Sequence, residues 1–132
     1  MEGIGRSLTF QMAIPFPVGD ELREEAVGYL HDAQRRLRSN DVDGAMLEGR
    51  RALEFLRTSS GWGWPENKKP KEERTADERW SLVRSALEEQ AGGALHKDAG
   101  TKGHVYSRIE AETLIAATTA LLRLPNVLKE TE

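Results

Sequence analysis

The stretch GGALHKDAGTKGHVYSRIEAETLIAATTALLRL, residues 92–124, decides the fold of this chain. It opens with a pair of glycines, continues through a loop, and ends in the most apolar helical segment of the sequence. Ser107 and Glu110 have the spacing of a capping box, in which the hydroxyl accepts from the third helical N–H and the carboxylate accepts from the N–H of the capping residue. We therefore expect a helix over about residues 107–124, stopped by Pro125.

The apolar residues of this helix recur at the spacing of one helical face. They are Ala111, Leu114, Ile115, Thr118, Leu121 and Leu122. The segment is too short and too rich in threonine to cross a bilayer, which needs roughly 20 apolar residues. We expect it to be the central helix of a folded core.

Three further amphipathic helices are expected before this one, over about residues 20–39, 41–58 and 75–91. The first two are separated by so short a turn that they should pack as an antiparallel hairpin. The third should begin with a capping box at Thr75 and Glu78 and end at the paired glycines. Its expected core face is formed by Ala76, Trp80, Val83 and Leu87, with Leu82 and Ala86 alongside.

The N-terminal stretch Ser7–Phe16 alternates apolar with polar or small residues, which is typical of an extended strand with one buried face. Its apolar side includes Phe10, Met12, Ile14 and Phe16. No second strand is evident, so this segment either pairs with another chain or domain, or lies as an arm over the helices. The sequence thus predicts an all-α four-helix bundle of antiparallel hairpins (residues 20–132) preceded by an N-terminal arm or single β-strand (residues 1–19).

Composition excludes several classes of protein. The chain has 132 residues, enough for one domain with its own core, and a net charge of −3 with 31% charged residues, which argues against a dominant nucleic-acid footprint. It contains no cysteine, which rules out disulfides and thiolate chemistry. No signal peptide is evident, so we expect a soluble cytoplasmic protein without cofactor, metal or membrane association.

The loop before the last helix is the strongest candidate for chemistry. It contains His96 and His104, and Arg108 follows at the start of the helix. Histidine transfers protons near neutral pH, and an arginine at a helix N-terminus suits an anion. The alternative is an ordinary solvated loop, and the spacing of the histidines does not match a zinc site.

Two other groups are candidate binding residues. Arg35, Arg36, Arg50 and Arg51 provide positive charge that would contact RNA phosphates, although nearby acids and the helix dipole favour a solvated surface. Trp62 and Trp64, in a Gly- and Pro-rich linker, either cap the end of the hairpin core or form an exposed interaction patch.

Two passages resemble the prokaryotic HEPN-like helical bundles. They are NDVDGAMLEGRRALE, residues 40–54, and ALHK, residues 94–97, followed by YSRIEAE, residues 106–112. Active members of that family are metal-independent ribonucleases whose Arg and His motif assembles at a dimer interface. Here Arg84 lies too far before His96, and no arginine stands at the family's distance before His104.

The resemblance therefore implies a degenerate member, from a bacterial defence or signalling protein, that works in dimerisation or partner binding rather than as an enzyme. We expect a homodimer or a complex with a partner protein or domain. Two alternatives stay open. One is a HEPN-type ribonuclease that uses the loop over residues 96–108. The other is an RNA-binding module that uses the arginines of the first two helices.

Overall fold

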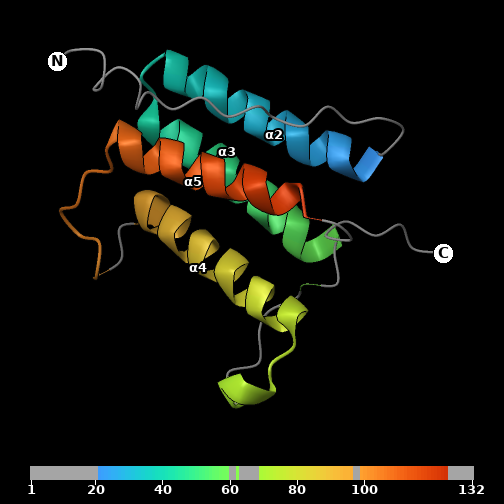
Figure 1. Cartoon of the computed structure of the whole chain (residues 1–132). Coiled ribbons are helices and arrows are strands. Elements are labelled where there is room, and N and C mark those ends of the chain that lie inside the picture. The colour runs from blue at the N-terminus through green and yellow to red at the C-terminus, as the bar shows by residue number, and fades with distance from the viewer. Residues whose placement is uncertain (1–20, 60–61, 63–68, 97–98, 125–132) are drawn as a thin grey trace, which may run out of the picture.

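The structure is a computed structural model that describes residues 21–59, 62, 69–96 and 99–124 (Figure 1). The elements in chain order are α2 (Glu21–Arg38), α3 (Val42–Ser59), the 3-10 turn η1 (Lys71–Glu73), α4 (Ala76–His96) and α5 (Arg108–Leu122). This part of the chain is all-helical, with four α-helices and no strand, which confirms the expected fold class. The arm or strand predicted over residues 7–16 lies outside the described residues.

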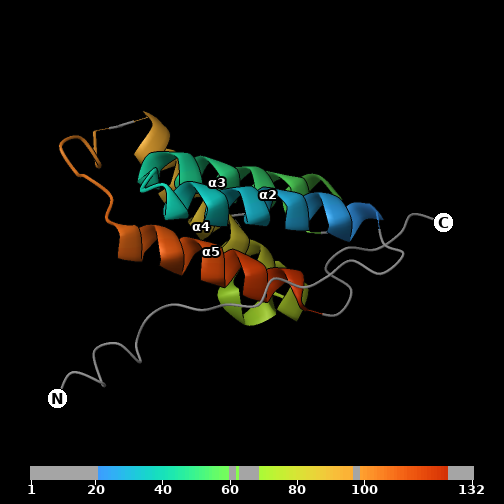
Figure 2. The ribbon, with the colours of Figure 1, turned by 90° about the horizontal axis from the view of Figure 1, so that it is seen from above.

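The four helices form a bundle in which α3 and α5 each contact all three others. Figure 1 shows α2 and α4 on opposite sides of this pair, with successive helices running in opposite directions. Seen from above, in Figure 2, α2 and α3 lie side by side on one side of α5. The most extensive contacts in the bundle are those of α3, so α3 and not the last helix is the central one, and the prediction of a central last helix is wrong.

The turn between α2 and α3 is closed by a Schellman motif. The N–H of Asp41 donates to the Arg36 carbonyl at 2.8 Å, and the N–H of Asn40 donates to the Leu37 carbonyl at 3.0 Å. Asn40 has a φ of 59°, the left-handed conformation that this motif requires. Asp41 then caps α3, because its Oδ1 accepts from the Gly44 N–H at 2.9 Å.

Helix α5 buries the predicted face, and both predicted capping boxes are present. Its buried residues are Ala111, Leu114, Ile115, Thr118, Thr119, Leu121 and Leu122. The hydroxyls of Thr118 and Thr119 donate to the carbonyls four residues earlier, each at 2.8 Å, so no water is needed to satisfy them. Ser107 with Glu110, and Thr75 with Glu78, make reciprocal side-chain and backbone hydrogen bonds that begin α5 and α4.

Helix α4 does not end at the paired glycines. It continues to His96, so the predicted end at residue 91 is wrong. A Cβ on Gly93 would lie 2.6 Å from the Tyr106 hydroxyl and 2.8 Å from Thr101 Cγ2. The absence of a side chain at this position therefore allows the following loop to pack directly against the helix. The Tyr106 hydroxyl also donates to Gln90 Oε1 at 2.6 Å. The glycine therefore serves close packing, and it does not stop the helix.

We predict that Gly93→Ala lowers the free energy of unfolding by about 1–3 kcal/mol, the usual cost of overpacking a filled site. Gly28→Ala is the matched control, because a Cβ on that helical glycine meets nothing within 4 Å. Replacing an exposed helical glycine by alanine should stabilise the chain by up to about 1 kcal/mol. Urea denaturation of both variants measures the contrast, and equal effects would refute the packing role of Gly93.

The face that α4 turns to the core also differs from the prediction. Trp80 and Val83, expected inside, are 40% and 43% exposed. The buried positions are instead Ser81, Arg84 and Glu88, followed near the end of the helix by Ala91, Gly93 and Ala94. The apolar spacing that indicates a core face is therefore present on α4, but the helix is rotated so that a polar face packs against the bundle.

Candidate functional site

The polar face of α4 forms an ion cluster with α3. Arg84 is fully buried and Glu88 is 6% exposed. Arg57, from the last turn of α3, donates from Nε to both oxygens of the Glu88 carboxylate, at 3.2 and 3.3 Å. Arg84 forms an ion pair with the same carboxylate. We call Arg57, Arg84 and Glu88 the α3–α4 ion cluster.

This cluster places two guanidinium groups on one buried carboxylate. Burial, and then the neighbouring charge of Arg57, lower the pKa of Arg84 to about 10. Burying Arg84 and Glu88 costs desolvation free energy that their ion pairs offset only in part, so the cluster is weak evidence for stability. This cluster was not predicted from the sequence, although Arg84 and Glu88 have the i, i+4 spacing of a helical ion pair.

On the outside of α4, the displaced apolar residues form a surface feature. We call Ala76, Trp80, Val83 and Leu87 the α4 stripe. Ala76 is exposed, Trp80 and Val83 are about half-exposed, and Leu87 packs partly against the core. Among the described residues, Val105 and Ile109 are the other large apolar side chains that are exposed; Val105 precedes α5 and Ile109 lies in its first turn.

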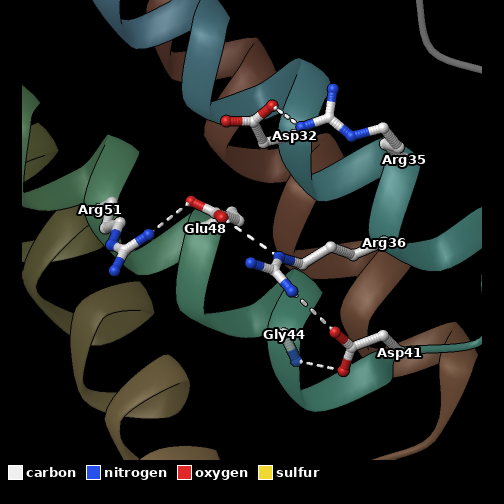
Figure 3. Close-up of polar contacts among 7 residues, drawn as sticks. All are labelled: Asp32, Arg35, Arg36, Asp41, Gly44, Glu48 and Arg51. Carbon is white, nitrogen blue, oxygen red and sulfur yellow. Dashed lines mark hydrogen bonds and ion pairs between the residues drawn. The ribbon is translucent and has the colours of Figure 1, made fainter.

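The predicted RNA-binding arginines are all paired with acids. Arg36 donates to Glu48 Oε2 at 3.1 Å and to Asp41 Oδ2 at 3.0 Å, and Arg51 donates to Glu48 Oε1 at 3.1 Å. Figure 3 shows Glu48 lying between the two guanidinium groups. In the same hairpin, Arg35 forms an ion pair with Asp32 and Arg50 with Glu54.

These contacts change the pKa values of the paired groups in the direction that keeps both of them charged. The hydrogen bond to Asp41, and then that to Glu48, raise the pKa of Arg36. The Gly44 N–H, followed by Arg36, lowers the pKa of Asp41. An anion arriving at this surface would compete with carboxylates already in place, so RNA binding here stays a prediction that the geometry does not favour.

In the candidate catalytic loop, the structure brings His104 to Glu110. The imidazole Nε2 lies 3.0 Å from Glu110 Oε2, and both side chains are close to half-exposed. The His104 ring also meets the Tyr106 ring edge-on, with centroids 4.5 Å apart. The Ser107 N–H, followed by His104, lowers the pKa of Glu110, which keeps this capping carboxylate ionised. A carboxylate that orients an imidazole is a usual partner of an acid–base histidine.

Arg108 has a contact that the sequence did not predict. Its Nη1 donates to the Leu37 carbonyl at 2.5 Å and to Asn40 Oδ1 at 3.3 Å, and its Nε donates to Glu112 at 3.1 Å. The guanidinium thus ties the start of α5 to the turn between α2 and α3. The side chain of His96 lies outside the described residues, so its place relative to His104 stays open.

Of the predicted interaction residues, Trp62 is 5% exposed and belongs to the hydrophobic core. This agrees with the alternative in which it caps the hairpin core, and it removes Trp62 from the exposed surface. Trp64 and the arm residues Phe10, Met12, Ile14 and Phe16 lie outside the described residues.

Comparisons of the chain with protein-family models, with curated proteins and with solved structures find no match. In the described part of the chain, His, Asp and Glu side chains do not gather in a group of three or more that could hold a metal ion. None of the helices described here combines the length and the apolar character needed to span a membrane.

Proposed function

We propose that this chain is a non-enzymatic helical interaction domain that pairs with a second copy of itself through the α4 stripe. The observation that carries the proposal is the orientation of α4, with charged residues packed inside and Trp80 and Val83 outside. Burying apolar side chains is the main source of binding free energy, and tryptophan is among the residues most enriched at interface hot spots.

The spacing of the stripe supports pairing with its own copy. Its residues follow one another at intervals of four, three and four, which is the a/d pattern of a two-helix seam. In an antiparallel pair, Leu87 of one copy would meet Ala76 of the other, and Trp80 would meet Val83. Each layer then combines a larger with a smaller side chain, whereas a parallel pair would set Trp80 against Trp80. Isologous pairing of this kind is the commonest symmetry of soluble oligomers.

The resemblance to HEPN-like bundles supports the same proposal, because that family assembles its sites at a dimer interface. On this basis we propose a role in a bacterial defence or signalling protein. The cytoplasm is the compartment we propose, because a chain without cysteine gains nothing from an oxidising environment.

The experiment is light scattering over a concentration series, on the full chain and on a chain that lacks residues 1–16. We expect the mean mass to rise from one copy toward two in both, because the stripe lies in α4. A rise that disappears on truncation would assign the association to the arm instead, and a mass that stays at one copy in both would refute self-association.

A second candidate function is a metal-independent ribonuclease that uses the loop before α5, and the pairing of His104 with Glu110 favours it. If this function holds, His104→Ala should abolish RNA cleavage, because the loop loses its proton-transfer group. Ser107→Ala is the control, since it weakens the helix cap without removing the imidazole. Cleavage that survives in a His96→Ala, His104→Ala double variant would eliminate the mechanism.

A further inference from the structure

A surface hollow of about 360 Å³ lies where η1 meets the first turn of α4. It is lined by Lys71, Glu72, Arg74 and Arg79, so three of its four side chains are cationic. The same stretch also contains the acids Glu73, Asp77 and Glu78, so the excess of positive charge is confined to the lining of the hollow. Its volume falls within the range of pockets that take small molecules, about 300–1,000 Å³.

The wall of the hollow is tied together by one of these cations. Arg79 donates from Nε to the Arg74 carbonyl at 3.2 Å and from Nη2 to the Lys71 carbonyl at 3.0 Å. The turn itself is closed by the Glu73 N–H, which donates to the Pro70 carbonyl at 3.0 Å. The guanidinium of Arg79 and the backbone that carries Lys71 and Arg74 are therefore set in place before a ligand arrives.

The three cations are not neutralised in the way the hairpin arginines are. Among the residues that the structure describes, Lys71, Arg74 and Arg79 form no ion pair with a carboxylate. Of the neighbouring acids, Glu78 is already engaged: it accepts from the Thr75 N–H and from Lys69 Nζ, each at 2.9 Å. The Thr75 N–H, followed by Lys69, lowers the pKa of Glu78 to about 2, so it remains bound to these partners at neutral pH.

We infer that this hollow binds the phosphate group of a small phosphate ester. Guanidinium groups match phosphate oxygens in geometry, and a lysine adds a mobile point charge. The positive end of the α4 dipole lies beside the hollow and adds to the attraction for an anion. Glu72, the one acid in the lining, gives a preference for ligands with a hydroxyl donor beside the phosphate.

The test is isothermal titration of the full chain with inorganic pyrophosphate at constant ionic strength. We expect saturable binding that weakens at least about tenfold in Lys71→Gln and in Arg74→Gln, which each remove one charge-assisted contact. Arg38→Gln is the matched control, because this exposed arginine also lacks an ion pair within the described residues but lies in the last turn of α2. Its affinity should equal that of the unchanged chain.

The inference is overturned if pyrophosphate does not bind at millimolar concentration, or if all three variants lose affinity equally, as general charge attraction would produce. A further arm uses a single-stranded RNA without terminal phosphates. Binding of that RNA through Lys71 and Arg74, without binding of pyrophosphate, would overturn the small ester in favour of a nucleic-acid backbone. Lys71 and Arg74 lie outside the α4 stripe, so a loss of pyrophosphate binding in their variants can be told apart from a loss of self-association.

Discussion

Replacing Glu88 by alanine should lower the free energy of unfolding by about 3–5 kcal/mol, the usual cost of removing one partner from a buried ion pair. The reason is that the two arginines of the α3–α4 ion cluster share this one carboxylate. Glu88 is the carboxylate that accepts from Arg57 and pairs with the fully buried Arg84. Without it, two positive charges would remain close together between α3 and α4 with little water to solvate them.

Glu89→Ala is the matched control, because the neighbouring residue is exposed on the same helix. Its effect should stay within about 0.5 kcal/mol, as for most surface substitutions. The measurement is the urea midpoint of both variants. A Glu88→Ala variant as stable as the control would show that the polar face of α4 is not buried in solution, and the orientation of the helix would then have to be revised.

The second large effect is expected on association. Val83→Glu should weaken self-association by at least about 30-fold, which corresponds to about 2 kcal/mol. The substitution places an unpaired carboxylate at the centre of the α4 stripe, where pairing would remove it from water. Since Val83 is 43% exposed in the single chain, the fold itself should tolerate the change. The measurement is the dissociation constant from sedimentation equilibrium, with the urea midpoint as the check on folding.

Ile109→Glu is the control for Val83→Glu. Ile109 is a β-branched apolar residue of similar size and is 74% exposed, but it lies on α5 away from the stripe. The dissociation constant of this variant should match that of the unchanged chain. Equal weakening by the two substitutions would mean that added negative charge, rather than the α4 stripe, governs association.

Much of the fold could be predicted because its signals are local. The capping boxes at Thr75 and Ser107 depend on residues three positions apart, and both form as their spacing predicts. The apolar face of α5 was also predictable from its helical spacing, and every residue predicted for that face is buried. The short hairpin turn could be predicted from two residues. Asn40 readily adopts the left-handed conformation, and Asp41 is a good N-cap for the next helix.

The orientation of α4 could not be predicted because it depends on a residue from another helix. The apolar stripe around Val83 and the polar face around Arg84 are both continuous along the helix, and periodicity favours burying the first. The second is buried because Glu88 meets Arg57, thirty-one residues earlier in the chain. Paired glycines also usually end a helix. Here Gly93 lies inside the helix because it packs against Tyr106, a tertiary contact that the local sequence does not reveal.

In the candidate sites, too, the residue types could be predicted from the sequence but their tertiary contacts could not. The sequence could identify the arginines of the hairpin but not their pairing with Glu48, because that pairing requires α2 and α3 to be aligned. It could identify His104 but not its approach to Glu110, which also completes a helix cap. The cations around the hollow at η1 are separated in the sequence, and only the turn brings Lys71 next to Arg79.

The central claim is that α4 exposes its apolar stripe to a second copy of the chain, and cysteine cross-linking tests it most directly. The chain has no cysteine, so a single introduced thiol reports one position without background. A short bifunctional maleimide should join two Val83→Cys chains, because in the antiparallel pair the two copies of residue 83 would lie only about 4.5 Å apart along the helices, whereas Ile109→Cys should remain a monomer. Ala76→Cys should also fail to link if the pair is antiparallel, since its two copies would then lie about 16 Å apart along the helices. Efficient linking through Ile109→Cys but not through Val83→Cys would contradict the account.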